Sequence, residues 1–133
     1  MKSNRFGCIE FLGCLGILIW FLVVLQRNTH FQIDTSLVFF MGLLPNLGAA
    51  WCVTLLGKWI VIFGCKKDYS IFKHGFICII IVACSLISEI SYDLFFASPF
   101  DYYDILVTII AQLLMFFIPI IMKDKSFKPN DDF

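Results

Sequence analysis

The sequence predicts an all-α polytopic membrane protein, with four transmembrane helices packed in a compact bundle. Of its 133 residues, 60% are hydrophobic and only 15% are charged, and the mean hydropathy is +0.90. A soluble domain usually carries about a quarter charged residues. So short a chain cannot bury this much apolar surface within itself, because small domains have a high surface-to-volume ratio. We therefore expect the lipid bilayer to surround much of the chain.

Four stretches are long and apolar enough to cross the bilayer as helices, which takes about 20 residues each. Helices are expected because the backbone groups of open strands would stay unpaired in lipid. The second stretch is long enough to tilt or to extend beyond the hydrocarbon core. The stretches cover residues 9–26, 36–64, 75–92 and 104–122, and residues 123–133 form a polar tail within a single domain of residues 1–133.

Basic residues predict the orientation of the spans, because cytoplasmic loops carry an excess of lysine and arginine. Three basic segments fall on one side of a four-span chain, and the two other loops hold only Arg27. We therefore expect a multi-pass protein with both termini in the cytoplasm and with the loop near residues 93–103 facing outward. The basic segments are Lys2 and Arg5; Lys66, Lys67 and Lys73; and Lys123, Lys125 and Lys128.

Residues 88–105, SEISYDLFFASPFDYYDI, hold four carboxylates and no basic residue. Glu89 lies about one turn inside the third span, and a carboxylate within a span usually faces a protein interior or a wet cavity. Glu89 is therefore the strongest functional candidate. The plainer interpretation is that Asp93 and Asp101 are solvated loop residues, and that Asp104 caps the start of the fourth helix.

The fourth span carries a polar stripe at intervals of four residues, which places the stripe on one helical face. Asn46 lies about 15 Å deep in the second span, at 1.5 Å per residue. These positions predict a lateral binding pocket, although a packing hinge at Pro45 without any ligand fits the same residues. The predicted binding residues are Asn46, Glu89, Asp93, Asp101, Asp104, Thr108 and Gln112.

Other residues of the spans have structural interpretations. Lys58 is expected to reach the membrane interface beside Trp59, and His30 and His74 are expected at the surface. The six cysteines form no CxxC pair, so we expect reduced thiols that pack as small hydrophobes. Small residues predict where the second helix packs closely against another helix; they are Gly42, Pro45, Asn46, Ala49, Val53 and Gly57.

The stretch EISYDLFFASPFDYYDILVTIIA resembles the C-terminal signature of VanZ-like membrane proteins. That signature has a Glu late in one span, a short loop with Pro, and Asp-x-x-Asp opening the next span. The resemblance implies that Glu89, Asp101 and Asp104 occupy the acidic positions of the family. It also implies a small multi-span architecture in the bacterial plasma (inner) membrane.

The chain also departs from the family pattern. The family's Gln after the Glu corresponds to Asp93, and its loop Arg is absent. Thr108 and Ala111 stand where the last helix of the family has Asn and Gly. The segment LLPNLGAA is similar to a Pro-Asn feature of some short members.

No nucleophile–base pair, phosphate-binding loop or His/Cys metal set is visible in the sequence, so we expect neither a cofactor nor a metal. The net charge of zero predicts no binding to nucleic acid. We favour non-catalytic binding of an envelope lipid, an amphiphile or a membrane partner, which includes a second copy of the chain, through an outward-facing acidic groove. The alternatives are an immunity protein against a pore-forming toxin, and a membrane enzyme that acts on a lipid head group with Glu89 and Asp104 as its candidate catalytic residues.

Overall fold

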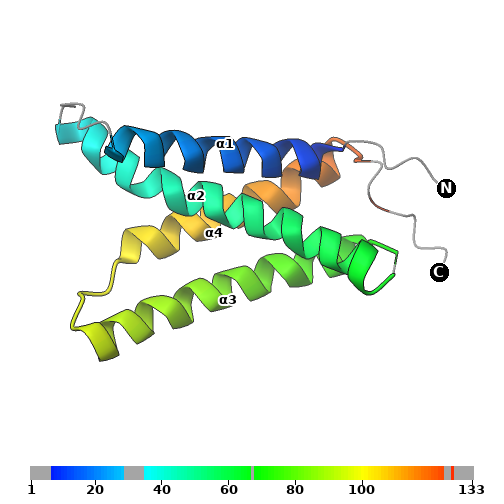
Figure 1. Cartoon of the computed structure of the whole chain (residues 1–133). Coiled ribbons are helices and arrows are strands. Elements are labelled where there is room, and N and C mark those ends of the chain that lie inside the picture. Colours follow the sequence, from blue (N-terminus) through cyan, green and yellow to red (C-terminus); the bar gives the residue numbers. More distant parts are fainter. Residues whose placement is uncertain (1–6, 29–34, 67, 125–126, 128–133) are drawn as a thin grey trace.

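Four long helices form the protein (Figure 1), whose computed structural model describes residues 7–28, 35–66, 68–124 and 127. Each helix is long and apolar enough to cross a membrane. The prediction of an all-α bundle with four membrane-spanning helices is therefore confirmed. The helices are α1 (Cys8–Asn28), α2 (Thr35–Trp59), α3 (Ile71–Phe96) and α4 (Tyr102–Ile121), and a short π-helix, η1 (Ile60–Gly64), follows α2.

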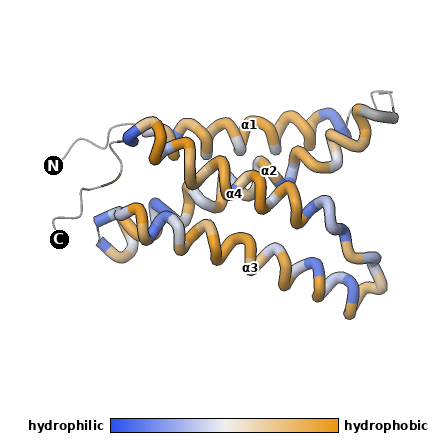
Figure 2. Tube along the Cα trace, turned by 180° about the vertical axis from the view of Figure 1, so that it is seen from behind, coloured by the Kyte–Doolittle hydropathy of each residue, from blue (hydrophilic) through white to orange (hydrophobic). Residues whose placement is uncertain are grey.

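The bundle has two distinct ends. The start of α1, the connection from α2 to α3 and the end of α4 lie together, and we call this the terminal end (Figure 1). Residues 97–101 connect α3 to α4 at the opposite end, which we call the loop end. Figure 2 shows hydrophobic residues along most of each helix, with hydrophilic residues mostly toward the two ends. This distribution fits helices that cross the apolar core of a bilayer.

Local hydrogen bonds explain why α3 and α4 differ in length from the predicted spans. The side chain of Ser70 accepts the N–H of Lys73 and begins α3 at Ile71 instead of residue 75. The helix ends where Ala97 adopts a left-handed conformation with φ of 51°. The cap of α4 is Asp101, and the predicted cap Asp104 lies inside the first turn. The assignment of Asp104 as the helix cap was therefore wrong.

The closest helix contact joins α1 to α2 at two glycines. A Cβ atom added to Gly48 would lie 2.6 Å from the carbonyl oxygen of Gly16, and one added to Gly16 would lie 2.7 Å from the Gly48 oxygen. The sequence predicted close contact on another face of α2, and of that face Gly57 packs closely against Ile77 of α3, at 3.0 Å from an added Cβ. Gly42 has no neighbour within 4 Å of its added Cβ, and Val53 is exposed. A small residue permits close approach only where a partner helix lies opposite it.

Side-chain hydrogen bonds join α2 to α4 in the middle of the bundle. The indole N–H of Trp51 donates to the Ala111 carbonyl at 2.9 Å. The Gln112 amide donates to the Ala50 carbonyl at 3.1 Å and accepts the Thr54 hydroxyl at 3.1 Å. Among the described residues, every buried side-chain nitrogen or oxygen has a partner. This pairing is what a hydrocarbon environment requires, because an unpaired buried polar group costs several kcal/mol there.

The glycine contact gives a matched test. Replacing Gly48 by Ala forces a Cβ against backbone atoms of α1, and such overpacking typically costs about 1–3 kcal/mol. We expect Gly48→Ala to lower the Tm of the purified protein in detergent. Gly42→Ala makes the same change on the same helix in open space, and the better helix propensity of Ala should leave its Tm equal or higher. Equal Tm losses in the two variants would contradict this packing.

Candidate functional site

Glu89, Asp101 and Asp104 come together at the loop end, and we call them the acidic cluster. The backbone N–H of Asp101 donates to Glu89 Oε2, with 3.3 Å between the two atoms. The Asp101 carboxylate accepts the N–H of Tyr103 at 2.9 Å and so caps α4. Both Asp101 and Glu89 act electrostatically on the Asp104 carboxylate. The helix cap therefore also brings the three carboxylates together.

Asn46 adds a neutral partner from α2. Its side chain lies close enough to the Asp104 carboxylate to favour the charged form of that group. The α2 helix continues through Pro45, so the position of Asn46 is fixed by the helix on both sides. A neutral amide can donate to a carboxylate without cancelling its charge. Three helices and the α3–α4 connection therefore contribute to the acidic cluster and its surroundings.

The other predicted binding residues lie in different surroundings. Thr108 donates its hydroxyl to the Asp104 carbonyl at 2.9 Å and accepts from Ser85 at 3.5 Å, which links α4 to α3 one turn below the cluster. Gln112 lies deeper in the bundle, where it forms hydrogen bonds with Ala50 and Thr54 of α2. Asp93 is exposed, and the described residues include no hydrogen bond or ion pair between it and the cluster.

The charge of the acidic cluster is not neutralised by the described part of the chain. No lysine or arginine in that part forms an ion pair with Glu89, Asp101 or Asp104. No three His, Cys, Asp or Glu residues there are close enough together to hold a metal ion. Like charges held close together favour the binding of a positive group.

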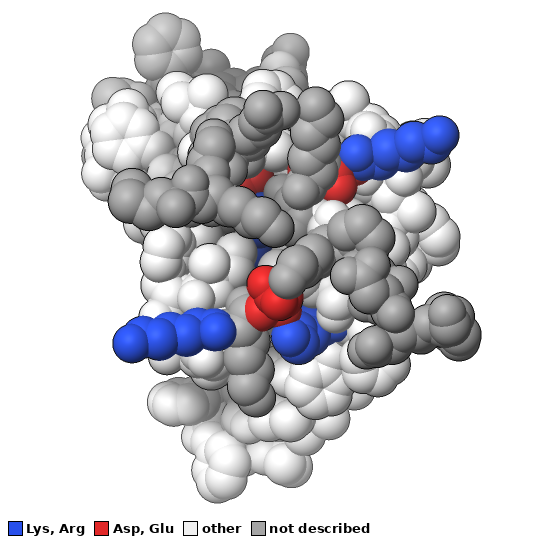
Figure 3. Space-filling model, turned by 90° about the vertical axis from the view of Figure 1, so that its right-hand side faces the viewer, with Lys and Arg blue, Asp and Glu red and all other residues white. Residues whose placement is uncertain are grey.

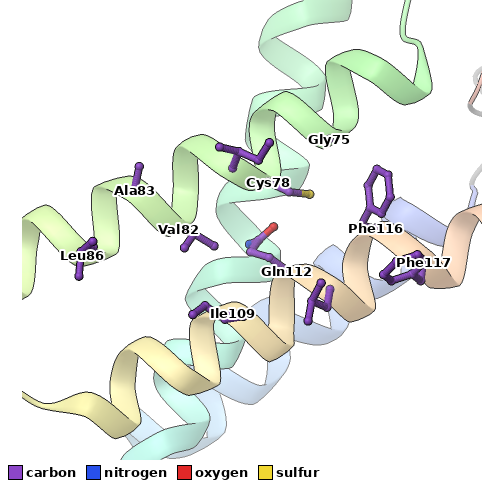
Figure 4. Close-up of a pocket in the computed structure, with 11 residues that line it drawn as sticks. Gly75, Cys78, Val82, Ala83, Leu86, Ile109, Gln112, Phe116 and Phe117 are labelled. Atoms are coloured by element: carbon purple, nitrogen blue, oxygen red, sulfur yellow. The ribbon is translucent and has the colours of Figure 1, made fainter.

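An apolar groove of about 600 Å³ lies between α3 and α4 (Figure 4). Leu86 and Ile109 line it toward the loop end, with Leu86 about one helical turn from Glu89 and Ile109 about one and a half turns from Asp104. Its volume falls within the range of roughly 300–1,000 Å³ that small-molecule sites occupy. The helices that form the groove are the same two that carry Glu89 and Asp104. Its lining residues are Gly75, Cys78, Ile79, Val82, Ala83, Leu86, Ile109, Gln112, Leu113, Phe116 and Phe117.

A second polar group lies inside the terminal end and was not predicted as a site. Lys58 forms an ion pair with Glu10, which joins α2 to α1. Only 3% of the Lys58 side chain and 16% of the Glu10 side chain are exposed. The Lys58 ammonium also lies 5.6 Å from the centre of the Tyr69 ring, within reach of a cation–π interaction. Lys58 therefore points into the bundle.

His74 completes this group, which we call the terminal cluster (Glu10, Lys58, Tyr69 and His74). Its Nε2 lies 2.9 Å from the Met115 carbonyl, and its Nδ1 lies 2.8 Å from the Tyr69 hydroxyl. A carbonyl can only accept, so Nε2 carries the proton and Nδ1 accepts the Tyr69 O–H. Burial raises the pKa of the Tyr69 phenol, which keeps this hydroxyl protonated. Tyr69 and His74 therefore join the α2–α3 connection to α4.

Two expectations about the terminal end were wrong. Lys58 does not reach the membrane interface, because Glu10 holds it inside the bundle. His74 is completely buried instead of lying at the surface, because its ring packs against Tyr69 and against Met115 and Phe116 of α4. One signal was available in the sequence: Glu10 and Lys58 have opposite charges and lie near the same ends of two neighbouring spans. The position of His30 lies outside the described residues.

Comparison with protein-family models, curated proteins and solved structures finds no match to this chain.

The buried ion pair predicts a specific pattern of stability changes. Glu10→Gln removes the Glu10 carboxylate that pairs with the buried Lys58, and breaking a buried pair in this way typically costs about 3–5 kcal/mol. Lys58→Met should cost less, because Glu10 is more exposed than Lys58. The double variant should be more stable than Glu10→Gln alone, since it leaves no unpaired charge. Thermal or chemical unfolding in detergent measures all three. If the stability loss of the double variant equals the sum of the losses of the two single variants, the ion pair does not stabilise the protein and the prediction is contradicted.

Proposed function

We propose that the protein is a non-catalytic integral membrane protein that binds a cationic amphiphile. The positive head group lies at the acidic cluster, and the apolar tail lies in the groove between α3 and α4. The single observation that carries this proposal is the position of an acidic cluster, without an ion pair to any described lysine or arginine, near the end of a 600 Å³ apolar groove. Glu89 and Asp104 of the cluster lie on α3 and α4, the two helices that line the groove.

The acidic cluster and the apolar groove each favour one half of an amphiphile. Carboxylates without a basic neighbour favour a cation, and an apolar groove favours a hydrocarbon tail. Both parts lie side by side along α3 and α4, so one molecule can occupy both. A cationic lipid and a cationic amphiphilic antibiotic share these features.

The proposal includes an orientation, with the loop end outward and the terminal end in the cytoplasm. The described lysines outside the bundle interior, Lys66, Lys73 and Lys123, lie at the terminal end. Figure 3 faces that end and shows lysine side chains extending outward there. Cytoplasmic segments carry such an excess of basic residues. The acidic cluster then opens to the outer leaflet of a bacterial plasma membrane.

Membership of the VanZ-like family is part of the same proposal. The resemblance concerns Glu89, Asp101 and Asp104, and it is supported by the short distance between Glu89 and Asp101 in space. A membrane enzyme that acts on a lipid head group is the second candidate. The observation that favours it is the electrostatic coupling of Asp104 to Glu89, since paired carboxylates can share acid and base roles.

Binding of a defined probe tests the proposal. We expect dodecyltrimethylammonium to bind the purified protein in nanodiscs more tightly than dodecyl maltoside, which has the same tail and a neutral head. Glu89→Gln combined with Asp104→Asn should weaken binding of the cationic probe about tenfold or more, because a hydrogen bond or contact to a charged group contributes roughly 1.5–3 kcal/mol. Native mass spectrometry measures the bound fraction directly.

Asp93→Asn is the matched control for this experiment, because it removes one exposed carboxylate on α3 outside the acidic cluster. It should bind the probe like the wild type. Equal binding of the cationic and neutral probes, or equal weakening by Asp93→Asn, would contradict the proposal. Chemical conversion of a lipid head group that depends on Glu89 and Asp104 would favour the enzyme.

A further inference from the structure

The groove between α3 and α4 is open along its side. Its deepest residues, Cys78 and Gln112, are buried, whereas Ile79, Leu113 and Phe117 at its rim are exposed. All of its lining residues belong to α3 and α4, and both helices are long and apolar enough to cross a membrane. Exposed apolar side chains in the middle of a membrane-spanning helix contact lipid hydrocarbon. The groove therefore opens sideways into the bilayer.

The groove extends over about the depth of one leaflet. Along α3 it runs from Leu86 to Gly75. At 1.5 Å per residue, Leu86 lies about 5 Å and Gly75 about 21 Å from Glu89 along the helix, toward the terminal end. One leaflet contributes half of a hydrocarbon core that is roughly 30 Å thick. An acyl chain whose head group lies beside Glu89 would therefore run along the groove.

Exposed tyrosines indicate the level of the acidic cluster in the membrane. Tyr92 lies about one turn from Glu89 toward the loop end, and Tyr102 and Tyr103 directly precede Asp104. All three tyrosine side chains are exposed. Tyrosine is enriched at membrane–water interfaces, where its ring contacts lipid and its hydroxyl contacts water. This places the acidic cluster at the level of the lipid head groups, in the leaflet at the loop end.

Packed side chains close the groove toward the terminal end. Phe116 lines the groove and stacks on the buried His74, with 6.0 Å between the ring centroids. A Cβ added to Gly75 would lie 3.1 Å from Phe116 Cε2, and Figure 4 shows this ring extending toward α3 near Gly75. Beyond the ring, Glu10 is already paired with Lys58. A positive ligand in the groove therefore has its charged partner at the loop end.

We propose that the ligand is a lipid with a cationic head group, which belongs to the leaflet at the loop end and enters the groove sideways with one acyl chain. This inference rests on the proposed function and names the class of its ligand. The head group stays at its ordinary level in the membrane, beside Glu89 and Asp104. Because lipid and apolar side chains are nearly equivalent solvents for the chain, the charge of the head group decides which lipid binds. Lipids of the opposite leaflet have their head groups at the terminal end and do not reach the acidic cluster.

Photolabelling from one leaflet at a time tests this inference. A two-chain trimethylammonium lipid with a diazirine in one acyl chain is placed in either leaflet of vesicles that hold the protein in one orientation. Peptide mapping then measures the adducts at Leu86 and Leu113. We expect about tenfold more of these adducts from the leaflet at the loop end than from the opposite leaflet, the change that loss of one contact between charged groups produces. A lipid with the same chains and a neutral maltose head should label the groove as weakly as the cationic lipid does from the opposite leaflet.

Two neighbouring residues of α3 give a matched pair of variants. Ala83 and Cys84 are both exposed, and only Ala83 lines the groove. Ala83→Trp places a large ring at the side opening and should reduce the groove adducts severalfold. Cys84→Trp adds a ring of the same size outside the groove and should leave the adducts unchanged. Equal labelling from the two leaflets, equal labelling by the cationic and neutral lipids, or equal effects of the two variants would overturn the inference.

Binding of dodecyltrimethylammonium to the same protein separates this inference from the function on which it rests. If the single-chain probe binds and the two-chain lipid does not label the groove, the ligand is not a lipid of the bilayer, and the proposed function stands. If neither the probe nor the lipid binds, the proposed function fails together with the inference. Binding of both, with labelling from the leaflet at the loop end, supports both.

Discussion

The structure depends on one constraint: within an apolar bundle, each polar group must find its partner in the protein. Polar side chains of α2 meet this constraint at three positions along the helix. Asn46 lies beside Asp104, Thr54 donates to Gln112, and Lys58 pairs with Glu10. These contacts join α2 to α4 and α1. They fix the rotation of α2 more specifically than its apolar residues could, because lipid and apolar side chains are nearly equivalent solvents.

The acidic cluster stands out against this background of paired groups. At the terminal end, the buried charge of Lys58 is paired with Glu10. Glu89 and Asp101 have backbone N–H donors, but no described lysine or arginine forms an ion pair with Glu89, Asp101 or Asp104. A positive head group would supply the missing charge, and the adjoining groove would accept its tail. The same constraint that holds the bundle together thus also indicates what the bundle binds.

Some features of the molecule follow from the sequence, and others do not. Four apolar stretches were sufficient to predict four helices, because length and hydropathy decide whether a segment can cross a bilayer. The meeting of Glu89 with Asp104 followed from their places beside one short connection. The inward direction of Lys58 and the burial of His74 did not follow, because both depend on which faces of separate helices meet. The close contact at Gly48 was missed for the same reason: small residues show where approach is possible, not where the partner helix lies.

The most direct test of the central claim is photolabelling with a long-chain trimethylammonium amphiphile that carries a diazirine in its tail. Peptide mapping of the labelled protein locates the tail. The account predicts adducts concentrated at groove residues such as Leu86, Ile109 and Leu113, which an excess of unlabelled amphiphile displaces. Adducts spread over lipid-facing residues of α1, such as Phe21, at the same level as over the groove would contradict it.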